Sequence, residues 1–167
     1  MIIERLRAGD GERLRAIRLR SLRDAPDAFA TTFDDAAALG LEHWNRQPEQ
    51  LATFVATERG TDLGLVRGAL PDHPQDAAYL VSMWVAPEGR REGIGSALVD
   101  AVVQWARAQG VTRLLLDVSE LNEPAIAFYT RKGFVPTGEV GALPPPREHV
   151  REIQMGMSLA RWQSHAF

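Results

Sequence analysis

A glycine-containing turn between a strand and a helix is the feature that most constrains this chain. Residues 79–85 are an apolar run rich in β-forming side chains, and residues 94–105 have a helical period. The turn between them reads Arg90-Arg91-Glu92-Gly93-Ile94-Gly95-Ser96. Residues 111–134 then repeat the order of strand, polar turn and helix. The pattern predicts an α/β fold in which the turn leads directly into a helix.

This turn has the features of an anion-binding site. Gly93 and Gly95 lack a Cβ, so the backbone there can adopt strained angles and approach a ligand closely. The first turn of the following helix offers unpaired N–H groups and the positive end of the helix dipole, which together stabilise a pyrophosphate. Arg90 and Arg91 add guanidinium donors that suit phosphate oxygens. We therefore expect a phosphorylated cofactor at this turn.

Two common phosphate-binding motifs do not fit the turn. A dinucleotide fingerprint needs a third glycine three residues after the second, where this chain has Leu98. A P-loop needs a lysine at its end, and the only lysine, Lys132, lies far along the chain. Arg90, Gly93 and Gly95 instead fit the Arg/Gln-x-x-Gly-x-Gly/Ala signature of the GNAT-type N-acetyltransferase superfamily, which the chain resembles.

A second segment carries the same resemblance. Residues 122–134 are similar to the family's Asn-x-x-Ala-x-x-x-Tyr-x-x-x-Gly-Phe segment, with Asn122, Ala125, Tyr129, Gly133 and Phe134 at the matching positions. The resemblance implies that Tyr129 is a catalytic acid, which donates a proton to the coenzyme thiolate. A phenol is protonated at neutral pH, as an acid must be. The alternative is a core tyrosine on a short amphipathic helix.

The resemblance also implies acetyl-CoA as a co-substrate, and the spacing of the histidines predicts no metal. The residues expected to bind it are Trp84, Val85, Arg90, Arg91, Gly93, Gly95, Ser96 and Asn122. In the family the backbone at the end of the strand, here Trp84 and Val85, bonds the pantetheine arm like an added strand. Asn122 is also a plausible helix N-cap, and both roles are compatible.

Composition excludes several other functions. A hydrophobic content of 45% and a charged content of 25% are typical of a soluble globular protein, and a net charge of −3 gives no global attraction to nucleic acid or an anionic membrane. The absence of cysteine excludes thiolate metal sites, and His43, His73, His149 and His165 show no ligand spacing. No apolar run is long enough for a signal peptide or a membrane span, so we expect a cytoplasmic protein.

We expect a single domain over residues 1–167, with antiparallel N-terminal strands, a central parallel pair that splays around the coenzyme, and flanking helices. Strands are expected at 1–7, 51–58, 63–70, 79–85, 114–118, 135–139 and 152–159. Helices are expected at 11–23, with Asp10 as N-cap, over 28–44, from 95 to 110, and from 122 to 133. The arginines of the first helix are expected on a solvated face; attraction of cofactor phosphates by some of them is the alternative. Residues 160–167 have no assigned structure. By resemblance, residues 28–44 form a lip over the acceptor site; plain core packing of Phe29, Phe33 and Trp44 is the alternative.

The implied function is direct transfer of an acetyl group to a primary amine of a small molecule or peptide. The sequence does not identify the general base, because residues 79–85 hold no carboxylate. By fold analogy the candidates are a positioned water, Asp117, Glu120, Glu139 and His149. Two other functions remain, an acetyl-CoA sensor that catalyses little and a transferase for a larger acyl group. The sequence does not identify the acceptor or the oligomeric state, for which a homodimer is one arrangement.

Overall fold

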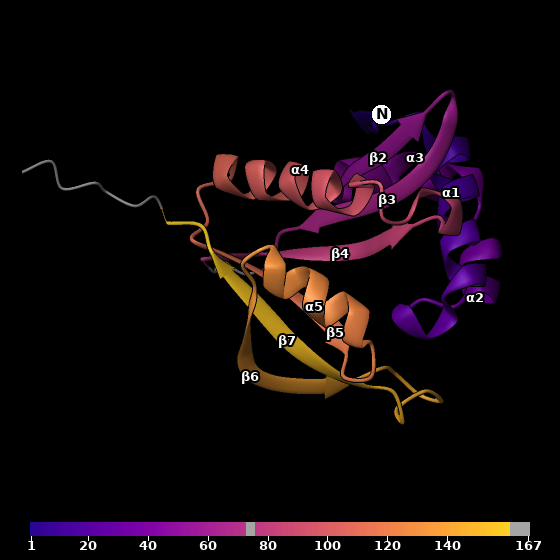
Figure 1. Cartoon of the computed structure of the whole chain (residues 1–167). Helices are drawn as coiled ribbons and strands as arrows, with labels where there is room; N and C mark the ends of the chain where they lie inside the picture. The colour runs from indigo at the N-terminus through magenta and orange to yellow at the C-terminus, as the bar shows by residue number, and fades with distance from the viewer. Residues whose placement is uncertain (73–75, 161–167) are drawn as a thin grey trace, which may run out of the picture.

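A mixed β-sheet organises the computed structural model, which describes residues 1–72 and 76–160 (Figure 1). Within these residues seven strands are ordered β1-β2-β3-β4-β5-β7-β6. Their bounds are β1 Ile2–Arg5, β2 Ala52–Glu58, β3 Thr61–Ala69, β4 Ala77–Val85, β5 Arg113–Ser119, β6 Val135–Ala142 and β7 Arg151–Ser158. The first four strands are antiparallel neighbours, as the alternating apolar pattern and the turn residues predicted.

Helices cover both faces of the N-terminal part of the sheet. They are α1 Gly11–Asp24, α2 Phe33–Ala37, α3 Leu41–Gln50, α4 Ile94–Ala108 and α5 Glu123–Arg131, with 3-10 turns η1 Pro26–Ala28 and η2 Pro87–Gly89. Gly64 and Gly68 of β3 face α4, because a Cβ on either glycine would collide with a side chain of that helix. Arg67 faces the opposite side of the sheet, where its guanidinium bonds to α3. The two faces of β3 thus pack against two different layers of helices.

The parallel pair predicted from the strand–helix–strand order is β4 and β5. The two strands pair only at Ala77–Arg113, Ala78–Leu114 and Tyr79–Leu115. Beyond these pairs they diverge toward the side of the molecule where α1 and α2 lie (Figure 1). β4 also bulges against β3, since Leu65 pairs with Trp84 while Arg67 pairs with Val81. Splay and bulge together leave backbone groups near the end of β4 without a strand partner.

Two local expectations were wrong, and that of Asp10 as an N-cap was confirmed only in its position. Residues 28–44 do not form one helix: the Thr32 side chain accepts a hydrogen bond from Asp35 N to start α2, and Gly40 precedes a separate α3 that runs on to residue 50. Asp10 stands at the N-cap position of α1, but its carboxylate accepts from Arg7 N at 2.7 Å and not from the helix. The arginines of α1 do not all lie on a solvated face, because Arg18 is buried.

The sequence predicts neither a membrane span nor a metal site. Within residues 1–72 and 76–160, no helix is long and apolar enough to cross a lipid bilayer. The same residues contain no group of three His, Asp or Glu side chains that could hold a metal ion. His73 and His165 lie outside the described residues, as does most of the unassigned tail.

Candidate functional site

A cavity of about 880 Å³ lies where the end of β4, the glycine turn, the start of α4 and α5 come together. Its lining includes all the residues expected to bind a coenzyme: Trp84, Val85, Arg90, Arg91, Gly93, Gly95, Ser96 and Asn122. The two sequence motifs therefore meet around one space, although a whole helix and a strand separate them in the chain. The divergence of β4 from β5 opens this space.

The two turn glycines have different structural reasons. Gly93 is the N-cap residue of α4 and has a φ of 80°, a conformation that residues with a Cβ rarely adopt. Gly95 lies inside the helix, where a Cβ would be 3.3 Å from Met83 Cε and 3.4 Å from Phe128 Cζ. Both of these side chains line the cavity, so a Cβ at Gly95 would add to its wall. The positive φ thus accounts for Gly93, whereas the missing Cβ of Gly95 leaves space in the cavity wall.

The N-terminus of α4 presents unpaired donors to this cavity. The first backbone N–H of the helix with an intrahelical partner belongs to Ala97, which donates to Gly93 O at 3.1 Å. The N–H groups of Ile94, Gly95 and Ser96 precede it and have no partner within the helix. They therefore form a group of donors at the positive end of a 15-residue helix.

Arg90 is engaged in protein contacts in this structure. Its Nη2 donates to Asp24 Oδ2 at 2.7 Å, and its Nε donates to Val85 O at 3.0 Å. The same carboxylate oxygen accepts from Trp84 Nε1 at 2.9 Å, so Asp24 ties the end of α1 to the end of β4. Arg90 therefore holds the turn in shape. Arg91, which is exposed and has a φ of 69°, is the turn arginine with no side-chain hydrogen bond among the described residues.

Two cations that the motifs did not identify lie beside the turn. Arg131 lines the cavity from the last turn of α5. Lys132 follows it, and its Nζ donates to Ser96 Oγ at 2.8 Å and to Asp100 Oδ1 at 2.7 Å. The expectation that Lys132 lies far from the turn holds along the chain but not in space. The P-loop motif still does not fit, because it needs the lysine within the loop.

Asn122 caps α5, as one of its two sequence interpretations predicted. Its Oδ1 accepts from Ala125 N at 3.2 Å. The side chain also lines the cavity, and its Nδ2 makes no hydrogen bond within the described residues. Capping uses only the acceptor end of the amide, which leaves the donor end available to a ligand.

Tyr129 lies in the core next to the cavity and is not part of its lining. Its ring packs at 5.3 Å from the ring of Phe128, which does line the cavity, and at 5.7 Å from the ring of Phe134. Burial raises the pKa of the phenol above its usual value of 10.0, so the hydroxyl keeps its proton. This environment is compatible with both interpretations of Tyr129, and its role as an acid stays a prediction.

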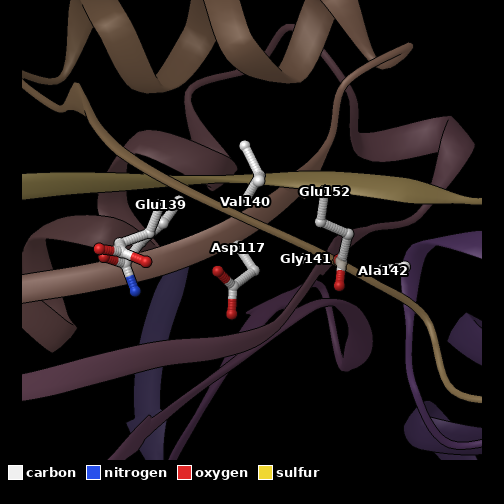
Figure 2. Close-up of a pocket in the computed structure, with 7 residues that line it drawn as sticks. Asp117, Glu139, Val140, Gly141, Ala142 and Glu152 are labelled. Atoms are coloured by element: carbon white, nitrogen blue, oxygen red, sulfur yellow. The ribbon is translucent and has the colours of Figure 1, made fainter.

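Two of the base candidates share a second, smaller cavity of about 460 Å³. Asp117 and Glu139 line it together with Glu152 and Gln154. Figure 2 shows the carboxylates of Asp117 and Glu152 pointing to the same side of the strands. Partial burial raises the pKa of Asp117, and burial together with the charge of Asp117 raises that of Glu152. A raised pKa makes a carboxylate a better proton acceptor near neutral pH.

The other two base candidates are surface residues. Glu120 faces Arg151, with 4.0 Å between Oε1 and Nε. His149 is exposed in the loop between β6 and β7. Neither lines either of these two cavities. Asp117 and Glu139 thus line a cavity, but it is not the one at the glycine turn, and the general base stays a prediction.

The loop between β6 and β7 is fastened to the segment after α1. Arg147 Nη1 donates to Pro26 O at 2.6 Å and to Phe29 O at 2.9 Å, and its Nη2 donates to Ala30 O at 2.6 Å. Phe29 and Ala28 line the larger cavity. Arg147 therefore holds part of the expected lip in place, a contact between two loops that no sequence motif indicated.

A family model described as the acetyltransferase (GNAT) family matches residues 14–134. The chain belongs to this family. A GNAT structure from Streptococcus pneumoniae superimposes with a TM-score of 0.79 at 21% identity, over 95% of this chain and 99% of that one, which confirms the fold class. The larger cavity thus lies at the turn that the GNAT signature predicted.

Curated relatives of this GNAT chain are named as N-acetyltransferases. Human N-acetyltransferase 8 is 39% identical over 90 residues, which cover 52% of this chain and 39% of that protein. Aminoglycoside N(6')-acetyltransferase type 1 of Klebsiella aerogenes is 32% identical over 126 residues, which cover 72% of this chain and 82% of that protein. The match spans less than half the length of the first of these relatives.

Proposed function

We propose that the chain is an acetyl-CoA-dependent N-acetyltransferase that transfers an acetyl group directly to a primary amine. The observation that carries this proposal is the large cavity, in which the unpaired N–H groups of α4 meet the open end of β4. A pyrophosphate fits the donors of α4, and Gly95 leaves the space that its approach requires. Arg91 and Arg131 add positive charge to the same walls.

Each part of the cavity has a role in this proposal. Ile94, Gly95 and Ser96 would bind the pyrophosphate through their N–H groups, and the backbone of Trp84 and Val85 would bond the pantetheine arm. When bound, the coenzyme supplies an activated acetyl thioester. The Nδ2 of Asn122, which capping leaves unused, would donate to the same arm.

Proton transfer needs a base and an acid from the chain. Asp117 is the base that we favour, because partial burial raises its pKa and it lies beyond the point where β4 and β5 separate. A water can relay the proton from the ammonium to the carboxylate. Tyr129 would hold a proton for the departing thiolate, and its ring packs 5.3 Å from that of Phe128, which lines the cavity.

The acceptor class comes partly from the relatives. The Klebsiella aerogenes relative is named for an aminoglycoside, a small-molecule amine. The lip formed by η1 and the loop after it, with Arg147 across it, would shape the acceptor site. We propose a small-molecule amine as the acceptor.

A two-stage experiment tests the function. Thermal unfolding is first measured with CoA and with acetyl-CoA, and free thiol release is then measured with a panel of amines. Stabilisation by both coenzyme forms followed by thiol release on at least one amine is the expected result. Stabilisation without release would favour an acetyl-CoA sensor, and faster release from a longer acyl-CoA would favour a larger acyl group. The absence of stabilisation by either form would overturn the coenzyme site.

A further inference from the structure

Two buried arginines in the described chain have no carboxylate partner. Arg18 of α1 is 4% exposed and Arg67 of β3 is 7% exposed. Within residues 1–72 and 76–160, every ion pair at 4.0 Å or less involves other residues. Buried charges in proteins are almost always paired, because their desolvation is costly. This pair therefore requires a physical explanation.

Neutral groups satisfy Arg67. Its Nε and Nη2 donate to Ser82 Oγ at 2.9 and 2.8 Å, and its Nη1 donates to Gln47 Oε1 at 2.7 Å. Ser82 has a φ of 59° and lies where β4 bulges against β3. Arg67 is thus held rigidly beneath the bulge, with its full positive charge and with two of its five N–H donors unused.

Arg18 has weaker contacts. Its guanidinium carbon lies 4.5 Å from the centre of the Phe29 ring, and Nη1 is 3.5 Å from Ser21 Oγ, the one hydrogen bond of this group among the described residues. Burial, and then the charge of Arg67, lower the pKa of Arg18 to about 9. Burial lowers the pKa of Arg67 to about 10. Both groups are cationic at neutral pH, and the charge of Arg67 acts on Arg18, so an anion bound near both groups would be stabilised.

The arginine pair lies next to the proposed acceptor side of the large cavity. Phe29, which stacks on Arg18, also lines that cavity. Met83, the neighbour of Ser82 in β4, lines it too. Rotation of the Phe29 ring would open a path from the cavity to the guanidinium of Arg18. Arg147 fixes the backbone of Phe29 through its carbonyl.

We propose that Arg18 and Arg67 form an anion subsite that binds a carboxylate of the acceptor. The acceptor class is then a small amine that carries a carboxylate group, such as an amino acid. The planar guanidinium group matches the geometry of a carboxylate, and the unused N–H groups of Arg18 can donate hydrogen bonds to the carboxylate oxygens. This inference rests on the proposed function, since it places the amine of the same molecule near the coenzyme cavity.

Matched acceptor pairs test the subsite. Initial rates with acetyl-CoA are measured for a panel of amino acids and for their primary amides, which keep the amine and lose the negative charge. The wild type should have a KM at least about tenfold lower for the acid than for its amide. Arg18→Met should reduce this ratio to less than about twofold, and Arg18→Lys should restore part of it. Arg15→Met, at an exposed arginine of the same helix, should keep the wild-type ratio.

Coenzyme binding separates failure of the subsite from failure of the proposed function. Thermal stabilisation by CoA should be the same in the wild type and in all three variants. A wild type that acetylates amides as well as acids, or an Arg18→Met variant that keeps the preference, would overturn the subsite alone. If no panel amine is acetylated while CoA still stabilises the protein, the thermal shifts produced by the acids and by their amides are compared in the presence of CoA. A larger shift with the acids would support the subsite. Equal shifts would then overturn the subsite.

Discussion

Replacement of Gly95 by alanine tests the coenzyme turn with the least damage to the fold. Gly95 lies within α4, where an alanine is a better helix former than glycine by about 1 kcal/mol. The new Cβ would meet Met83 Cε at 3.3 Å and Phe128 Cζ at 3.4 Å, so each neighbour must shift by a few tenths of an ångström. Methionine is flexible enough to do so at little cost. The melting temperature should therefore change by less than about 4 °C.

The affinity for the coenzyme should fall much more than the stability of the fold. The Cβ would project from the cavity wall at the helix N-terminus, where the phosphate oxygens must come within hydrogen-bond distance of the backbone. Loss of one hydrogen bond to a charged group costs about 1.5–3 kcal/mol. That range corresponds to an affinity for CoA about 10-fold to 150-fold weaker. Gly95→Val, with two further methyl groups, should weaken binding more.

Gly93 can also be tested, and Gly110 at the other end of α4 provides its matched control. Gly93 and Gly110 have φ values of 80° and 78°, and a Cβ on either would meet nothing within 4 Å. Alanine at each position should cost about 1–2 kcal/mol of backbone strain and lower the melting temperature by about 2–8 °C. Only Gly93→Ala should also weaken CoA binding.

For all these variants, isothermal titration with CoA gives the affinity, and thermal unfolding without ligand gives the stability. If Gly95→Ala and Gly95→Val both bind CoA within about threefold of wild type, the coenzyme does not occupy this turn.

Three further changes have defined outcomes. Tyr129→Phe should reduce turnover by about 10²–10⁴-fold with little change in CoA affinity, and unchanged turnover would remove Tyr129 from the mechanism. Hydrogen bonds from Arg13 lower the pKa of Asp62 below 3.8, so the stability from this pair is fully present above that pH and is lost as the pH falls through the lower, folded-state pKa. The melting temperature of Asp62→Asn should therefore fall less than that of wild type below about pH 4, and parallel curves would contradict this. Arg147→Met should lower kcat/KM for the acceptor and leave CoA affinity unchanged; an unaltered kcat/KM would show that the lip does not depend on this arginine.

The parts of the fold that could be predicted depend on local patterns. The strand of residues 79–85, the glycine turn and the helix after it follow from periodicity and from Gly93, which the backbone angle of the turn requires. The parallel pairing of β4 and β5 follows from the helix between them. The pattern of residues 28–44 failed because an alanine-rich stretch has helical composition throughout. Thr32 and Gly40, which start new helices, gave a weaker signal.

The contacts between distant segments could not be predicted. No local pattern indicates that Asp24, at the end of α1, accepts hydrogen bonds from Arg90 and Trp84. Similarly, Lys132 reaches Ser96 only because α5 lies beside the start of α4. The motifs identified the residues of the turn that match the GNAT signature, and these residues line the larger cavity. The charges that surround them depend on the tertiary packing of this chain.

Arg18 is a case in which the sequence did contain the signal. Leu14, Ile17 and Leu22 lie on the buried stripe of α1, and Arg18 and Ser21 occupy positions of the same stripe at helical spacing. The prediction that the arginines of this helix share one solvated face did not take this spacing into account. A charged residue on an apolar stripe contradicts the pattern that stabilises the helix, and such contradictions tend to mark functional positions. Arg67 sits in the same way among the buried residues of β3. Because each breaks the hydrophobic pattern of its own element, and the charge of Arg67 acts on Arg18, the anion subsite proposed above would account for both residues.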